Sequence, residues 1–504
     1  MQGLNIKEEP LQSLSLYWKL LFSIAIILNT VVILTSELGL DAHVREALVE
    51  SEQGWSLDWG DVRTSSPMGS DPNDSTIFDS ASNGSTKQLA VIGMILAIII
   101  CWRLKFDIPT ITVLMINPAL IFSVGRGYYE YTYLAMLGAS WAIWHNSRNY
   151  SKEKGVLSRI VAITFSASIL LWVLMIKLRI ELGSLFLPLI GLVLIGYLID
   201  MMPNERFNPK KSLLFGFSGG ILGVVILGIL DYGTFAVITD EPARFLQALP
   251  IAIFGVIIIY GLFGMVIWPF ITEIWKSMSK ENDRVTSELC LLIGVLTGSI
   301  MTYVACLWTF ESILWGSQWP WHMWTMGNNG RYITILAIPS YLLIKQVNGN
   351  INWDQPKAIT GVLLLLPLSF AAGIHGQTYW TDDAADQFSS DMGNDDQFLL
   401  IHDSSLGMHY LYTFHTYIDN VEERNITGHW RSPESNWYSE IQNKQEFEML
   451  GNISGIEWII FAPGTAWATT GVIDGWYLHS SGKADFMNGG NEWSVWTYQD
   501  SNSD

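Results

Sequence analysis

Runs of apolar residues, most of them close to twenty residues long, recur along the first three quarters of this 504-residue chain. An α-helix needs about 20 predominantly apolar residues to cross the hydrocarbon core of a bilayer. The clearest runs cover residues 16–35, 156–176, 213–230, 251–270 and 289–310. With the weaker runs between them, the pattern predicts about eleven spans and therefore a polytopic α-helical membrane protein.

Basic residues indicate how these spans are oriented, because lysine and arginine are enriched in short cytoplasmic loops. They cluster on every second connection, as a chain that starts in the cytoplasm requires. The first run is too long for a cleaved signal peptide, and no small-residue cleavage site follows it, so we expect a retained span. We therefore expect a multi-pass protein of the cell membrane with a cytoplasmic N-terminus and an extracytoplasmic C-terminus.

Beyond residue 374 the long apolar runs stop, and shorter segments predict a small α/β domain. Residues 381–396 are polar and acidic and read as a linker or as the loop that leads into this domain. We expect a transmembrane domain over 1–374, with a first external loop at 36–88, and an extracytoplasmic domain over 375–504. The expected strands are 397–402, 456–462 and 493–498, with helices near 408–418 and 444–450.

The segments expected outside the membrane are strongly acidic. Residues 36–88 carry a net charge of −7 and residues 375–504 a net charge of −16, against −19 for the whole chain. The remainder of the chain therefore carries a net positive charge. An acidic outer surface argues against nucleic-acid binding and is typical of a solvated face. Recruitment of a cationic partner is the alternative.

The segment 39–48, directly after the first span, contains the first candidate for chemistry. Apolar Ala42, Val44 and Leu48 alternate there with charged residues, which is typical of a short helix lying along the membrane surface. Asp41 would then sit near the lipid headgroups, where reduced hydration can tune a carboxylate toward general-base work. The alternative is that Asp41 only caps this helix.

A long N-terminal span followed at once by an aspartate is similar to the GT-C superfamily of membrane glycosyltransferases. This group includes the protein O-mannosyltransferases, the aminoarabinose transferases and the oligosaccharyltransferase catalytic subunit. Residues 117–130 resemble the family's second external loop, which places charged and aromatic residues near the donor. Gly330-Arg331-Tyr332 followed by Pro339 resembles an Arg-Tyr…Pro pattern at the outer start of a late span. An external α/β domain is a common attachment.

Two departures from the family pattern narrow what this resemblance implies. The Asp-Glu pair of the mannosyl and aminoarabinose branches is Asp41-Ala42 here, so the second acid is missing or replaced by His43. The Trp-Trp-Asp acceptor motif of oligosaccharyltransferases is absent from the tail. Transfer of a single sugar is therefore favoured over glycosylation of peptide sequons.

The resemblance implies that a sugar moves from a polyprenyl (dolichyl-type) phosphate to a glycan, lipid or protein acceptor, with Asp41 as general base and His43 as a second catalytic candidate. Charge that develops on a departing phosphate needs fixed cations in a poorly hydrated site. Lys177 and Arg179 break the positive-inside pattern, and phosphate binding supplies a reason. The candidate substrate-binding residues are Arg126, Glu130, Lys177, Arg179, Arg331 and Tyr332, and Arg244 is a further outer cation.

Several of these residues also have a purely structural explanation that involves no substrate. Arg126 and Glu130 have the i,i+4 spacing of a structural helix pair. Lys177, Arg179 and Arg331 could extend their charged ends toward lipid headgroups.

Metal binding has weak support in the sequence. Asp58 and Asp61 could hold a divalent cation, but their spacing is unspecific and a solvated turn is the favoured explanation. His402, His409 and His415 lack the close spacing of a metal site, so no zinc is expected.

Two other classes of function remain as alternatives. A transporter or flippase for a lipid-linked solute usually buries charges at mid-membrane and has related halves. The span centres are almost free of charge here, and no halves repeat. A non-enzymatic receptor or assembly protein would use the spans only as an anchor. A site that joins Asp41, Arg126 and Arg331 would favour the enzyme, and scattered positions would favour the anchor.

Overall fold

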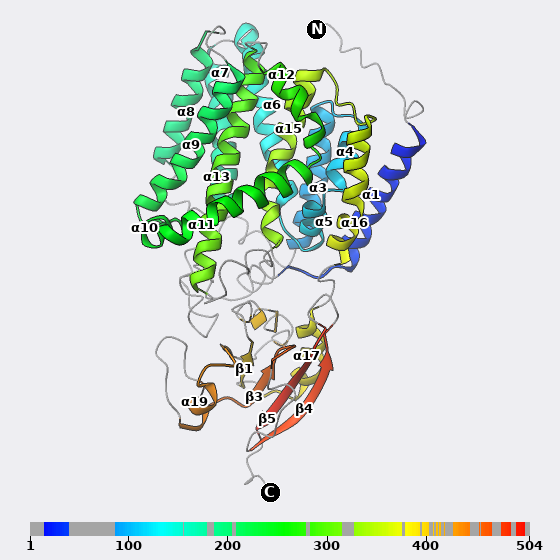
Figure 1. Ribbon diagram of the computed structural model, residues 1–504, viewed down its shortest axis with the longest axis vertical. Helices are drawn as coiled ribbons and strands as arrows, with labels where there is room; N and C mark the ends of the chain where they lie inside the picture. The colour runs from blue at the N-terminus through cyan, green and yellow to red at the C-terminus, as the bar shows by residue number, and fades with distance from the viewer. Residues whose placement is uncertain are drawn as a thin grey trace.

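A bundle of helices lies above a smaller domain that contains a β-sheet (Figure 1). We call the end of the bundle that faces this domain the domain side. The computed structural model describes residues 15–39, 86–154, 156–178, 186–203, 208–278, 283–314, 327–374, 379–393, 396–402, 407, 410–411, 413–414, 418, 427–443, 453, 455–465, 475–484 and 490–498.

The bundle is built from α-helices, with short 3-10 turns and two longer irregular helices, η6 and η8. The π-helix η6 continues α11 without a break, and the 3-10 helix η8 continues into α15. The elements are α1 (Leu16–Thr35), α3 (Thr86–Arg103), α4 (Ile108–Met115), α5 (Pro118–Gly125), α6 (Glu130–Lys154), α7 (Val156–Lys177), α8 (Phe186–Met201), α9 (Pro209–Ile229), η5 (Gly233–Ala236), α10 (Val237–Asp240), α11 (Pro242–Ala252), η6 (Ile253–Phe263), η7 (Trp268–Phe270), α12 (Ile271–Ser277), α13 (Arg284–Leu314), η8 (Gly327–Leu336), α15 (Ala337–Asn348) and α16 (Pro356–Ile374).

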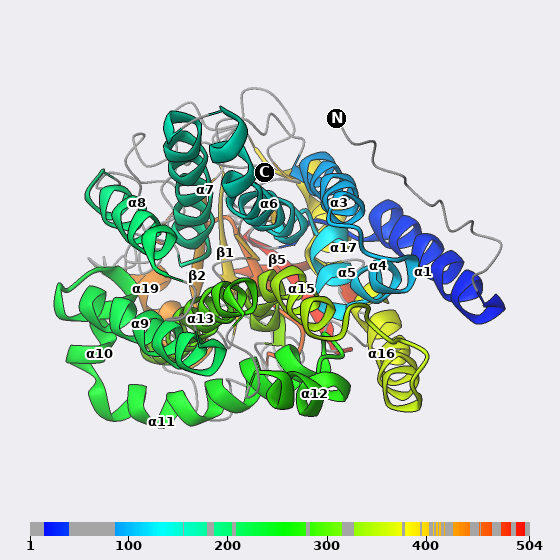
Figure 2. The same cartoon turned by 90° about the horizontal axis from the view of Figure 1, so that it is seen from above.

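Six of the described segments are long and apolar enough to cross a membrane: α1, α7, α9, α11 with η6, α13 and α16. The bent pair of α4 and α5 makes a seventh. The helices α3, α6 and α8 and the pair of η8 with α15 pack into the same bundle (Figure 2). Among the described residues, six to seven of the about eleven expected spans therefore have the length and apolarity of a membrane crossing, and the protein is a multi-pass membrane protein.

The span formed by α4 and α5 is broken at Asn117-Pro118, and its two halves meet at 63°. The Asn117 side chain accepts hydrogen bonds from the first backbone N–H groups of α5, and its amide donates to the Gly264 carbonyl at 2.8 Å. From α1, the buried amide of Asn29 donates to the Met115 carbonyl at 2.9 Å. A broken helix exposes backbone groups that cannot find water in the membrane, and these amides supply the missing partners.

The helices α9 and α13 approach each other closely because glycines line both sides of their contact. A Cβ added to Gly216 would lie 2.4 Å from the Leu291 carbonyl oxygen, and one added to Gly294 would lie 2.4 Å from that of Leu213. Small residues at such positions let two membrane helices pack backbone to backbone.

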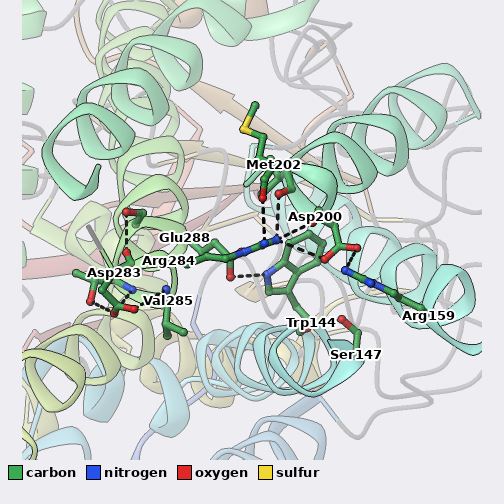
Figure 3. A network of polar contacts seen from close by, with 12 residues as sticks. Trp144, Ser147, Arg159, Asp200, Met202, Asp283, Arg284, Val285 and Glu288 are labelled. Atoms are coloured by element: carbon green, nitrogen blue, oxygen red, sulfur yellow. Dashed lines mark hydrogen bonds and ion pairs between the residues drawn. The ribbon is translucent and has the colours of Figure 1, made fainter. Parts of the chain in front are cut away.

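Away from the domain, a charge network joins four helices (Figure 3). Arg284 at the start of α13 donates to carbonyl oxygens at the end of α8, the closest being that of Asp200 at 2.9 Å. Arg284 also pairs with Glu288 (Nε–Oε1 3.0 Å), and Asp200 pairs with Arg159 of α7. Trp144 of α6 donates to the other oxygen of Glu288 at 3.1 Å. Two arginines thus meet two carboxylates.

The C-terminal part forms a five-stranded sheet in the order β2-β1-β3-β5-β4. The strand β1 pairs in parallel with β2 and β3, whereas β5 is antiparallel to β3 and β4. This arrangement confirms the expected α/β fold. The elements are α17 (Trp380–Phe388), η9 (Ser389–Asp391), β1 (Gln397–Ile401), β2 (Thr427–Arg431), α19 (Trp437–Asn443), β3 (Trp458–Phe461), β4 (Trp476–Lys483) and β5 (Glu492–Tyr498).

Each face of this sheet has its own apolar core. On one face, Phe398 and Trp458 pack with side chains of α17 and with Phe414. On the other, Leu399 and Ile459 pack around Trp437 of α19 and its neighbours. Successive strand residues point to opposite faces, so alternate positions of β1 and β3 serve the two cores.

One expectation for this domain was wrong. Residues 381–396 were expected to form a linker or leading loop, but α17 occupies their first half. Trp380, Ala384 and Phe388 recur every four residues and are buried against the sheet. Asp383 and Asp386 are exposed and Asp382 is buried, and together these aspartates hide the helical period in the composition.

All three expected strands are present, as β1, β3 and β5. The strands β2 and β4 were not predicted, because one is short and polar and the other is an edge strand with several exposed residues. The described residues between 407 and 418 are helical, as expected, whereas 444–450 lie outside the described part of the chain.

Candidate anion-binding site at the domain side

Several helix ends bring charged residues together at the domain side of the bundle. Arg126 follows the last residue of α5, and the chain turns through Gly127, whose φ of 75° favours glycine, before α6 starts at Glu130. Lys177 is the last residue of α7, and Arg331 lies on η8. Helix ends far apart in the sequence thus deliver these four side chains to one place.

Glu130 pairs with two cations. Its Oε2 lies 3.0 Å from Lys177 Nζ, and its Oε1 lies 3.7 Å from Arg331 Nε. The three side chains are only 2–7% exposed. Loss of one member would leave a buried charge without its counter-charge, which costs about 3–5 kcal/mol.

Aromatic rings surround the two cations that Glu130 holds. Lys177 Nζ lies 4.6 Å from the centre of the Tyr133 ring and 5.4 Å from that of Tyr332. Arg331 Cζ lies 4.1 Å from the Tyr128 ring centre and 5.5 Å from that of Tyr332. A ring face attracts a cation through its quadrupole, by about 2 kcal/mol when desolvated, and does not neutralise the charge.

Arg126 extends this cluster. Its Cζ lies 4.0 Å from the Phe122 ring centre, and Phe122 stacks on Tyr128 at 6.1 Å, so Arg126 and Arg331 flank one aromatic pair. Its Nη1 makes only long bonds, to the carbonyls of Phe122 (3.4 Å) and Ala372 (3.5 Å). Its Nη2 is buried without a hydrogen-bond partner among the described residues. A buried donor of this kind is suited to receiving an acceptor from a ligand.

The end of α1 reaches the same place. The Gly39 backbone N–H donates to the Arg126 carbonyl at 3.0 Å, and a Cβ added to Gly39 would lie 2.2 Å from the Tyr128 hydroxyl oxygen. Lys87, at the start of α3, donates to the Ser36 carbonyl. The segment 36–39 is therefore held against the cation cluster just before the chain leaves the described residues.

Positive charge exceeds negative charge in this group. Among the described side chains, four cations gather with two carboxylates: Lys87, Arg126, Lys177 and Arg331 with Glu37 and Glu130. Placing unbalanced charge away from water is unfavourable unless a counter-ion compensates it. The arrangement is therefore suited to an anion that enters from the membrane surface.

Tyr379, between α16 and α17, adds a neutral hydroxyl to this group. Burial raises the pKa of its phenol well above 10, Tyr128 acts in the same direction, and the Arg126 guanidinium acts against both. Tyr379 therefore stays uncharged beside the Arg126 guanidinium.

The structure brings together Arg126, Glu130, Lys177, Arg331 and Tyr332, five of the residues that the sequence marked for substrate binding. Asp41, His43 and Arg179 lie outside the described residues. Arg244 does not join the cluster: it is exposed on α11 and pairs with Glu241 at 3.8 Å.

The helix pair suggested for Arg126 and Glu130 is not formed. The two residues belong to different helices, because the turn at Gly127 separates α5 from α6. The ion pairs of Glu130 among the described residues are to Lys177 and Arg331. Lys177 and Arg331 also do not extend into the headgroup layer, since both side chains are buried.

Sequence reasoning missed the aromatic part of the site. Tyr128 and Tyr133 lie within or beside the segment compared with the family's second loop, but nothing in their spacing marks them as cation partners. Tyr379 lies 249 positions beyond Glu130 and could be placed here only by the fold.

Within the part of the chain that the structure describes, no group of three His, Cys, Asp or Glu side chains could hold a metal ion. Asp58 and Asp61, the candidates for a divalent cation, lie outside that part.

Comparison with known proteins gives one similar structure. No protein-family model and no curated protein matches the chain. A crystal structure of ArnT from Cupriavidus metallidurans in the apo state is similar with a TM-score of 0.41 and 11% identity, over 95% of this chain and 97% of that chain. At this TM-score the likeness supports no conclusion about activity, donor or acceptor.

Proposed function

We propose that this protein is a membrane glycosyltransferase that moves a sugar from a polyprenyl-phosphate donor to an acceptor hydroxyl at the domain side of the membrane. The observation that carries the proposal is a group of three buried cations in contact with aromatic rings: Lys177 and Arg331 pair with the buried carboxylate of Glu130, and Arg126 shares an aromatic pair with Arg331. A phosphate monoester carries about −1.5 to −2 charges at neutral pH, which suits this excess of cations. The site lies at span ends, where the phosphate of a membrane lipid would lie.

In the proposed step, the acceptor oxygen forms a bond to the anomeric carbon while the bond from that carbon to the phosphate oxygen breaks. The phosphate oxygen keeps the electron pair, and the hydroxyl proton passes to the carboxylate of Asp41. His43 is the second candidate for moving that proton. Fixed cations stabilise the charge that builds up on the departing phosphate and need no reorganisation during the step.

The role of Asp41 rests on its place in the sequence. Only Leu40 separates it from Gly39, whose backbone N–H is bonded to the Arg126 carbonyl. The proposal therefore places the base beside the cations that hold the donor phosphate.

The binding residues have distinct proposed roles. Lys177 and Arg331 bind the phosphate, Glu130 fixes their positions, and the Tyr332 ring lies between them. Arg179 follows Lys177 by two positions and is proposed to add a further cation. A monodentate lysine and a planar guanidinium together can contact several phosphate oxygens.

The orientation of the chain belongs to the same proposal. The domain is acidic, and the basic clusters lie at the opposite ends of the spans, so the domain side is the extracytoplasmic face and the N-terminus is cytoplasmic.

The test is incubation of membranes that contain the protein with a panel of labelled polyprenyl-phosphate sugars, followed by measurement of sugar release and transfer. We expect turnover with one donor and a loss of about 10³-fold in Asp41→Asn, with unchanged insertion. Arg244→Gln is the matched control, because it removes an exposed cation outside the cluster. Full activity of Asp41→Asn would refute the assignment of the base, and no turnover of any donor would refute transfer.

A further inference from the structure

Tyr379 lies where the membrane bundle, the end of α1 and the C-terminal domain meet. Its backbone N–H donates to Glu37 Oε2 at 3.3 Å, which ties it to the segment after α1. Its hydroxyl lies close enough to the Arg126 guanidinium for the two groups to interact electrostatically, which ties it to the cation cluster. The side chain is 7% exposed. One residue thus contacts both parts of the proposed site.

On its other side Tyr379 is part of the domain. Its ring packs edge-on against Tyr410 at 6.2 Å, and Tyr410 packs in turn against Trp380 (5.7 Å) and His402 (5.4 Å). His402 follows β1, and its carbonyl accepts a hydrogen bond from Trp430 at 3.2 Å. A continuous series of packed rings therefore leads from the carboxyl end of the parallel strands to Arg126.

We infer that Tyr379 is a positioning residue through which the docked C-terminal domain holds Arg126 and the segment 36–39 in their working geometry. The inference rests on the proposed function and adds a role for the domain: the domain completes the donor-phosphate site without itself touching the reacting atoms. Asp41, the proposed base, follows the segment 36–39 in the sequence with only Leu40 between them.

The physical reason is that the Arg126 side chain is held only weakly from the bundle side. The Nη1 bonds of Arg126 within the bundle are 3.4 and 3.5 Å long, near the limit of a hydrogen bond. The Gly39 N–H bond at 3.0 Å ties the segment 36–39 to the backbone carbonyl of Arg126, so a shift of this residue also moves the segment. A shift of about 1 Å in a positioning group can lower a rate about 100-fold.

The test compares Tyr379→Phe with wild-type full-length protein in detergent. Phenylalanine keeps the ring packing and removes only the hydroxyl that meets Arg126. We expect kcat with the donor to fall about 10-fold, and Tyr379→Ala to lower it about 100-fold. Tyr438→Phe is the matched control, since it removes a half-buried hydroxyl on the opposite face of the same sheet.

A second readout does not depend on activity. Exchange of the Gly39 amide hydrogen reports directly on its bond to Arg126, and we expect it to speed up about 10-fold in Tyr379→Phe, with an unchanged melting temperature. Glu37→Ala removes the acceptor of the Tyr379 N–H and should have the same effect on exchange, whereas Glu37→Gln retains an acceptor oxygen and should restore slow exchange.

These results separate the inference from the proposed function. Wild-type exchange and wild-type kcat in Tyr379→Phe would overturn the inference while transfer stands. Faster exchange in a protein that turns over no donor would support the coupling and refute the transferase. If Tyr379→Phe fails to fold, the Glu37 pair decides: equal exchange in Glu37→Ala and Glu37→Gln overturns the inference.

Discussion

The two ends of the bundle contain charge clusters that differ in the balance of their charges. At the far end, Arg159 and Arg284 meet Asp200 and Glu288, and backbone carbonyls and an indole N–H take part in the remaining contacts (Figure 3). At the domain side, two buried cations pair with Glu130, Arg126 lies on the same aromatic pair as Arg331, and aromatic faces occupy the places where further carboxylates would stand.

This difference in charge balance distinguishes a network that only stabilises the fold from a site that can bind a ligand. Charges that are matched one to one fasten helices and leave no attraction for a ligand. Aromatic rings attract cations but do not neutralise them, so the excess positive charge of the cluster is balanced only when an anion binds. The carboxylates of both clusters are buried, although the far-end arginines are 14–27% exposed. The ratio of charges is the clearer difference between the two clusters.

Removing charges from each cluster in a separate variant should give the largest difference in activity between the two ends of the bundle. In Lys177→Gln/Arg331→Gln/Glu130→Gln no charge is left behind, so the fold should persist while phosphate stabilisation is lost. Since each lost donor costs about 10²–10³ in rate, we expect transfer to fall by at least about 10⁴-fold. The measurement is turnover of the labelled donor by purified protein.

The matched control is Arg284→Gln/Glu288→Gln at the far end, which removes one cation and one carboxylate from the balanced network. Its activity should stay within about threefold of wild type, because replacing both members of a pair is often nearly neutral. Equal losses in both variants would mean that the domain-side cluster is structural as well.

Breaking the balanced network should have the next largest effect, and on stability alone. Arg284→Ala leaves Asp200 and Glu288 with less compensation and removes donors from the end of α8. We expect a loss of about 3–5 kcal/mol in unfolding free energy. Thermal or denaturant unfolding in detergent measures it. A stability loss below about 1 kcal/mol would show that water compensates these carboxylates.

Ligand binding should stabilise only the unbalanced cluster. Polyprenyl phosphate without a sugar, at 100 times its dissociation constant, should add about 2.7 kcal/mol to wild-type stability. Arg331→Gln should lose most of this gain, and Arg284→Ala should keep it despite its lower starting point. An equal gain in both variants would place the lipid phosphate elsewhere.

Much of the membrane part could be predicted from the sequence, because each span needs its own apolar run and each run is read independently. Lys177 was found because it stands on the side where cations are uncommon, and Arg331 because Gly330-Arg331-Tyr332 resembles a family pattern at the outer start of a late span. Their shared partner Glu130 was named because it ends the segment that resembles the family's second external loop. The structural alternative for it, an i,i+4 pair with Arg126, is prevented by the turn at Gly127.

The aromatic half of the site could not be predicted, because tyrosines are frequent along the chain and a cation–ring contact depends on the packing of distant helices. In the domain, three strands were found from their apolar runs. The helix α17 was missed because its aspartates dominate the composition, although Trp380, Ala384 and Phe388 carry the period. A short helix is therefore better predicted from the spacing of its apolar residues than from the overall composition of the segment.

The smallest effect is expected in the domain, where protonation of a histidine adds a charge beside a balanced arginine–glutamate pair. Arg431, completely buried, donates from Nε (3.1 Å) and Nη2 (3.0 Å) to one oxygen of Glu440, and His429 lies on the same strand. Burial, and then the charge of Arg431, lower the pKa of His429 from 6.5 to about 4. The unfolded chain therefore binds more protons between these values, so this contribution is complete above pH 6.5 and is lost as the pH falls through about 4.

From pH 7 to pH 5 we expect the domain to lose about 2 kcal/mol of stability from this residue. Hydrogen exchange of the β2 amides in the full-length protein, corrected for the intrinsic rate at each pH, measures that loss. His429→Gln cannot take up the proton, and its β2 protection should therefore change less between the two pH values. The same pH dependence in His429→Gln would assign the effect to other groups, and a constant protection in wild type would mean that a third charge is tolerated beside Arg431 and Glu440. Constant protection in wild type would weaken the conclusion that charge balance separates a structural pair from a binding site. A pair whose charges are already matched would then accept an added cation without a loss of stability.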